Sequence, residues 1–89
     1  MASIRNLKKD INNVLGDLID AVYFVEQGLG REISVEGDAI IDQAILVFDR
    51  LIEDVNKKDI QKPSAHFKQV RETLMQEATA LVSRINQLS

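Results

Sequence analysis

The sequence predicts an all-α domain in which three helices form an antiparallel, up-down-up bundle. Its 89 residues are enough for one domain only, which we expect to span 1–89. Four glycines and one proline leave little turn chemistry for a many-stranded sheet, and the absence of cysteine excludes a disulfide framework. Apolar residues recur at steps of three and four along three stretches of similar length, which is the period of a helix.

The first helix is predicted over residues 3–27. Ser3 is a suitable N-cap, and the apolar series then runs at helical spacing from Ile4 to Leu29. Gly28 and Gly30 end the helix, because glycine readily adopts the left-handed conformation found after a helix C-terminus. Gly16 lies inside the helix, where glycine costs about 1 kcal/mol relative to alanine.

The second helix is predicted over residues 38–57. Asp38 can cap it, although Ser34, with Glu36 nearby, could start the helix a turn earlier. Eleven of the 17 residues from 39 to 55 are apolar, and at 100° per residue most of them fill an arc of roughly 160°. This arc is wider than the stripe that a helix in a small bundle needs.

The third helix is predicted over residues 64–88, with Ser64 as its N-cap directly after Pro63. Its apolar stripe comes close to a seven-residue repeat and comprises Phe67, Val70, Leu74, Ala78, Leu81, Ile85 and Leu88. With short connections, neighbouring helices are expected to pack antiparallel.

Excess apolar surface predicts that the bundle is completed by dimerisation. The arcs of the first two helices exceed the roughly 100° that a core-facing stripe requires, and Phe24 and Leu46 fall outside them. Scattered surface hydrophobes are a simpler interpretation, since such residues are common. A two-fold homodimer is the alternative that we expect, with a candidate interaction surface made of Tyr23, Phe24, Ile40, Leu46, Val47 and Leu51.

Charge is distributed unevenly although its net value is only −3. In an up-down-up bundle the second connection lies beside the start of the first helix. One end would then carry a candidate anion-binding cluster, which we call the basic end: Arg5, Lys8, Lys9, Lys57, Lys58, Lys62, Lys68 and Arg71. The other end would be acidic, with Glu26, Glu32, Glu36, Asp38 and Asp42.

Two interpretations of the basic end stay open. Helix-end electrostatics explain Lys57 and Lys58, which lie at a helix C-terminus, but not the cations near the start of the first helix. The other interpretation is a site for an anionic partner, either nucleic acid or an acidic protein. Nucleic acid is the weaker choice, because the chain is acidic overall and its four aromatic residues, Tyr23, Phe24, Phe48 and Phe67, form no visible stacking platform.

No catalytic constellation is evident, so we expect a non-enzymatic protein without cofactor or metal. His66, the only histidine, is expected to be exposed at a helix start, and no acidic residue lies three or four positions away. A carboxylate site for Mg²⁺ is the remaining enzymatic hypothesis. It would need the acidic stripes of the first two helices to meet, and these contain Asp17, Asp20, Asp42, Asp49 and Glu53.

The stretch 4–17, IRNLKKDINNVLGD, resembles the start of small uncharacterised all-α proteins from Bacteroidetes. The resemblance implies a cytoplasmic bacterial protein with no assigned activity, and it transfers no functional residues. No apolar run approaches the ~20 residues of a membrane span, so we expect no membrane association. The expected function is a helical interaction or assembly module that binds a second copy or an unidentified protein, with binding of an anionic partner as the alternative.

Overall fold

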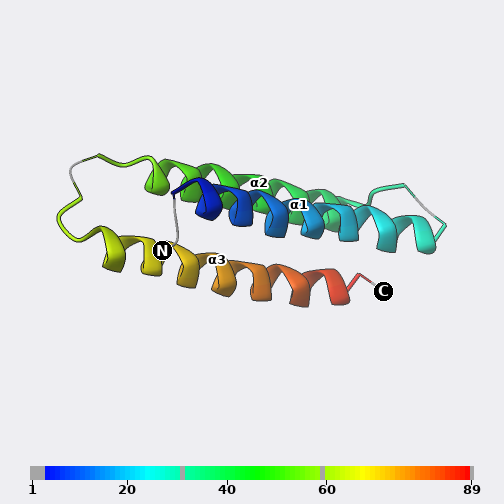
Figure 1. The fold of residues 1–89 in the computed structure, drawn as a ribbon. Helices are drawn as coiled ribbons and strands as arrows, with labels where there is room; N and C mark the ends of the chain where they lie inside the picture. The colour runs from blue at the N-terminus through cyan, green and yellow to red at the C-terminus, as the bar shows by residue number, and fades with distance from the viewer. Residues whose placement is uncertain (1–3, 31, 59, 89) are drawn as a thin grey trace.

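The protein is a bundle of three long helices (Figure 1). The computed structural model describes residues 4–30, 32–58 and 60–88, and these form α1 (Ile4–Gly28), α2 (Val35–Val55) and α3 (Pro63–Asn86) without any strand. α2 returns beside α1, and α3 again runs in the direction of α1, with every pair of helices in contact. The all-α, three-helix prediction is therefore confirmed. The bundle measures 49 × 20 × 17 Å.

α2 begins one turn earlier than the range 38–57 predicts. Its N-cap is Ser34 rather than Asp38, because the Ser34 side chain accepts a hydrogen bond of 3.0 Å from the backbone N–H of Gly37. The helix ends at Val55, with Asn56 as its C-cap.

The other two helices differ from their predicted ranges by one or two residues. Ser3, the predicted N-cap of α1, lies outside the described residues. α3 starts at Pro63 rather than Ser64, since proline fits the first turn of a helix, and its N-cap Lys62 makes no side-chain capping hydrogen bond. Leu88 lies beyond the end of α3, but its side chain is still buried.

A single apolar core runs along the axis of the bundle. It is built from Leu7, Ile11, Leu15 and Val22 of α1, from Ile40, Ile41, Ala44, Val47, Leu51 and Val55 of α2, and from Val70, Leu74, Leu81, Ile85 and Leu88 at the C-terminal side. Ile40, Val47 and Leu51, which the sequence assigned to an interaction surface, are therefore part of the core. The wide arc of α2 is used within the chain, because α2 packs against both α1 and α3.

Glu26 is fully buried, with none of its surface exposed, although the sequence places it among the surface carboxylates of the acidic end. The Ser34 hydroxyl donates a hydrogen bond of 2.6 Å to Glu26 Oε1, while its oxygen caps α2. The carboxylate therefore lies at the N-terminus of α2, where the helix dipole favours a negative charge. This arrangement joins the end of α1 to the start of α2.

Among the described residues, no helix has the combination of length and hydrophobicity needed to cross a membrane.

Candidate functional site

The basic end is assembled by the fold as the topology predicts. The start of α1, the end of α2 and the start of α3 lie at the same end of the bundle (Figure 1), and they bring Arg5, Lys8, Lys9, Lys57, Lys58, Lys62, Lys68 and Arg71 to that end. Within the described ranges, two of these cations are paired. Arg71 Nη1 lies 2.9 Å from Asp10 Oδ2, and Lys57 Nζ lies 3.6 Å from Asp54 Oδ1. Acidic residues thus dilute the positive charge of this end.

His66 is half-buried and holds the start of α3 against the end of α2. Its Nε2 lies 2.7 Å from the backbone oxygen of Asp54. A carbonyl oxygen can only accept, so Nε2 carries the proton of this hydrogen bond. The prediction of an exposed histidine is therefore wrong. The last backbone carbonyls of a helix have no partner within that helix, and the hydrogen bond to one of those of α2 holds the His66 ring against α2.

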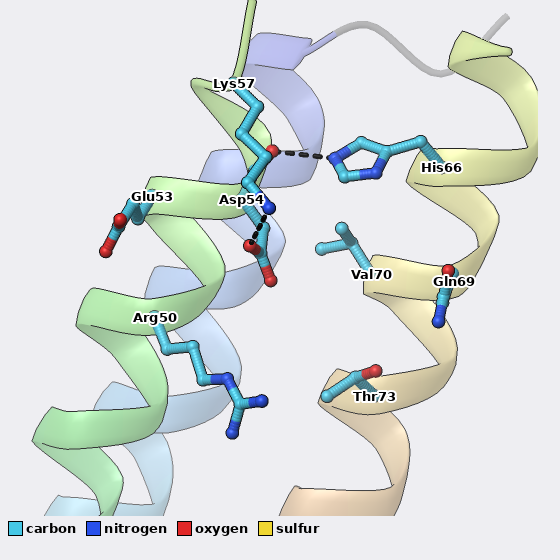
Figure 2. A pocket seen from close by; sticks show the side chains of 8 residues that line it. All are labelled: Arg50, Glu53, Asp54, Lys57, His66, Gln69, Val70 and Thr73. Atoms are coloured by element: carbon cyan, nitrogen blue, oxygen red, sulfur yellow. Dashed lines mark hydrogen bonds and ion pairs between the residues drawn. The ribbon is translucent and has the colours of Figure 1, made fainter. Parts of the chain in front are cut away.

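Next to His66, a polar groove of about 550 Å³ lies between the exposed sides of α2 and α3 (Figure 2). In Figure 2 the Arg50 side chain extends into the space between the two helices, and His66 reaches across toward α2. We call this the α2/α3 polar groove; it is lined by Arg50, Glu53, Asp54, Lys57, His66, Gln69, Val70 and Thr73. Of its polar residues, sequence analysis singled out only Glu53, Lys57 and His66, because the other polar residues are ordinary surface residues until α3 packs beside α2. Val70 belongs to the predicted apolar stripe.

A second, apolar groove of about 180 Å³ lies between α1 and α2, with Gly16, Ile19, Ile45 and Phe48 among its lining residues. Ile45 keeps 46% of its surface exposed. Helical spacing continues the same face one turn along each helix, through Tyr23 of α1, 43% exposed, and through the half-buried Ile52 of α2. We define the α1/α2 face as Gly16, Ile19, Tyr23, Ile45, Phe48 and Ile52.

The candidate interaction surface predicted from the sequence is not one surface. Tyr23 belongs to the α1/α2 face, whereas Leu46, 62% exposed, lines a separate groove of about 340 Å³ between α2 and α3. Phe24 is 79% exposed and, as the next residue after Tyr23, is turned by about 100° around α1. Leu46, Val47 and Leu51 line that α2/α3 groove together, whereas Tyr23 is the one predicted residue on the α1/α2 face.

The acidic stripes of α1 and α2 do not come together. Asp17, Asp20, Asp42, Asp49 and Glu53 are all exposed. Within the described ranges, no group of three or more histidine, aspartate or glutamate residues is arranged to hold a metal ion.

Comparison of the chain with protein-family models, curated proteins and solved structures finds no match. The resemblance of residues 4–17 to Bacteroidetes proteins stays a prediction. Any proposal about function therefore depends on the geometry of the grooves, the exposed apolar face and the basic end.

Proposed function

We propose that the protein is a non-enzymatic, cytoplasmic helical interaction module that forms a homodimer through the α1/α2 face. The observation that carries the proposal is the open apolar groove on this face, with Ile45 and Tyr23 nearly half exposed at its surface. A domain of 89 residues can bury only part of its apolar surface as a monomer. Docking this face against a second copy would bury more of it and so add stability.

Gly16 supports the choice of this face. A Cβ atom added at Gly16 would meet no atom within 4 Å, so packing inside the chain does not require a glycine there. Glycine nevertheless costs about 1 kcal/mol in a helix interior relative to alanine. A notch without a side chain in the middle of an apolar groove allows the backbone of a partner helix to approach closely.

Charge complementarity selects a second copy in antiparallel orientation as the occupant. Helical spacing puts Lys9 two turns before Gly16, near the basic end, and puts Asp38 two turns before Ile45, at the other end. Both side chains are exposed. A two-fold axis perpendicular to the bundle would place the basic end of one copy beside the acidic end of the other, whereas parallel docking would bring like charges together.

The test compares two neighbouring residues of α2 in sedimentation velocity. We expect the unchanged protein to sediment at twice its 10.0 kDa monomer mass. Ile45→Glu should give the monomer, because it places a charge in the proposed interface. Leu46→Glu is the matched control: Leu46 is at least as exposed but lies on the α2/α3 side, so this variant should stay dimeric.

Two results would contradict the proposal. The first is a monomer at concentrations of hundreds of micromolar. The second is a dimer that Leu46→Glu dissociates and Ile45→Glu does not, which would move the interface to another face.

The second candidate function is binding of an anionic partner at the basic end, and the convergence of eight cations there favours it. Its support is weaker because Asp10 and Asp54 pair with two of the eight. An acidic protein suits this surface better than nucleic acid, because Phe67, the aromatic residue beside Lys68, is packed against the core and offers no open stacking platform. Binding that weakens steeply with salt and is lost in a Lys8→Gln, Lys9→Gln double variant would favour this candidate.

A further inference from the structure

We infer that the groove of about 340 Å³ between α2 and α3 binds a basic amphipathic helix of a protein partner. We call it the Leu46 groove; its apolar lining comes from Leu46, Val47 and Leu51 of α2, and Glu77 lines it from α3. It shares no residue with the α1/α2 face, so the inference does not depend on dimerisation.

Leu46 is the apolar anchor of this groove. Its side chain keeps 62% of its surface exposed, although Val47 and Leu51 beside it are buried. An apolar side chain of a partner placed against Leu46 would cover this surface and would rest on a packed floor. Removal of that apolar surface from water is what would give the partner its affinity.

The charge around the Leu46 groove selects a basic partner. Three exposed carboxylates lie within about 60° of Leu46 around α2, at 100° per residue: Asp42, Asp49 and Glu53. Glu77 adds a fourth from α3, and none of the four is paired with a described residue. Arg50 is the one cation among the residues that line the groove. Lysine or arginine side chains on both flanks of a partner would therefore meet unpaired carboxylates.

The same charge disfavours a second copy of this chain in the Leu46 groove. In Figure 2 the Glu53 side chain points away from α3, so the acidic row lies on the outer side of α2. A two-fold axis through Leu46 would bring the acidic rows of two copies of α2 together. Such a juxtaposition of like charges opposes association, whereas a basic helix would relieve it.

A helix is the form of partner that this groove can accept. Its walls are α2 and α3, whose backbone groups already bond within each helix, so an extended segment would find no backbone partners there. A helix satisfies its own backbone and packs its side-chain ridges into the groove between two others. Asp42 and Glu53 are about 16 Å apart along α2 at 1.5 Å per residue, which about three turns of a partner helix would cover.

The probe is a synthetic peptide of about 18 residues, long enough to form a helix, with leucines along one face and lysines on the flanks. A second peptide carries glutamate in place of every lysine. Calorimetric titration of the protein at low salt should give saturable binding of the lysine peptide. The glutamate peptide should bind at least tenfold more weakly.

Leu46→Gln should weaken binding of the lysine peptide by about tenfold, because it removes the apolar contact without changing the charge. Met75→Gln is the matched control. Met75 is also 62% exposed, but it lies on α3 outside the groove, so this variant should change the affinity less than twofold. Circular dichroism would verify that each variant keeps its helices.

A pair of double variants tests the charge. Asp42→Asn with Asp49→Asn should weaken binding several-fold at low salt and less at high salt, where exposed charges are screened. Asp17→Asn with Asp20→Asn removes the same charge from exposed positions of α1 and should change the affinity less than twofold.

Four outcomes would overturn the inference. Equal weakening by a variant and its control would show unspecific adsorption. Equal affinity for the two peptides would remove the charge preference, and absence of saturable binding at hundreds of micromolar peptide would remove the site. The fourth is a Leu46→Gln protein that sediments, without peptide, at a lower mass than the unchanged protein, which would show that a second copy occupies the groove.

Discussion

At the scale of single residues, Gly37 and Gly16 show that the same residue type can meet opposite requirements. A Cβ atom at Gly37 would lie 2.8 Å from Glu26 Oε1, 3.2 Å from Ile33 Cγ2 and 3.3 Å from Val22 Cγ1. At Gly16 the same atom would meet nothing within 4 Å. Gly37 is therefore required by the packing of α1 on the start of α2, whereas Gly16 is not required by any contact within the chain.

Alanine at these two positions should have effects of opposite sign. Gly37→Ala should destabilise the fold by about 1–3 kcal/mol, because the buried Glu26 carboxylate and two core side chains would have to move. Gly16→Ala should raise the free energy of unfolding by up to about 1 kcal/mol through helix propensity. Urea denaturation of each substitution in the Ile45→Glu background, which we expect to be monomeric, measures both changes. A stabilising Gly37→Ala would contradict the close packing described here.

At the scale of elements, the junction between α1 and α2 depends on one serine with two roles. The Ser34 oxygen caps α2, and its hydrogen reaches Glu26 at the end of α1. The start of α3 has no equivalent, because its N-cap makes no side-chain hydrogen bond. The two helix starts should therefore respond very differently to loss of a hydroxyl group.

Ser34→Ala should lower the free energy of unfolding by about 1–2 kcal/mol through loss of the helix cap. The total loss should be larger, because the buried Glu26 carboxylate also loses a hydrogen-bond donor. Ser64→Ala is the control, since Ser64 is exposed in the first turn of α3 without a capping role. It should stay within about 0.5 kcal/mol of the unchanged protein. Thermal or urea unfolding compares the two, and equal effects would show that the Glu26–Ser34 contact contributes nothing.

The elements themselves could be predicted because apolar periodicity is a local property of the sequence. The contacts that side chains make between the helices could not be predicted in this way. Whether Ile40, Val47 and Leu51 face solvent or α3 depends on where the third helix lies, and the spacing within α2 does not contain that information. Glu26 appears in the sequence as one more surface acid, since its partner Ser34 was only an alternative helix start. Likewise, the groove at Arg50 exists only once α2 and α3 are side by side.

At the scale of the whole molecule, the bundle is long for its size. Its Cα radius of gyration is 14.7 Å, whereas a compact domain of this length has a value of about 12 Å. A long, thin shape exposes more side surface than end surface. Side-by-side docking through the α1/α2 face can therefore bury far more area than contacts between the ends.

Small-angle X-ray scattering tests this arrangement. The antiparallel dimer should keep a longest dimension close to the 49 Å of one bundle while its cross-section grows, since the two copies lie alongside each other. An end-to-end dimer would be about twice as long. The Ile45→Glu variant supplies the monomer reference. A dimer near the doubled length would contradict docking through the α1/α2 face.

The odd number of helices has a mechanical consequence. The chain enters the bundle at the basic end and leaves it at the opposite end, so the first and last described residues lie far apart along the long axis (Figure 1). A pulling force applied between them would act along all three helices and would load their shared core in shear. Helices pulled in this way must slide past one another over their whole length, whereas helices in a hairpin can peel apart one turn at a time. The bundle should therefore resist a pulling force that is applied between these two residues.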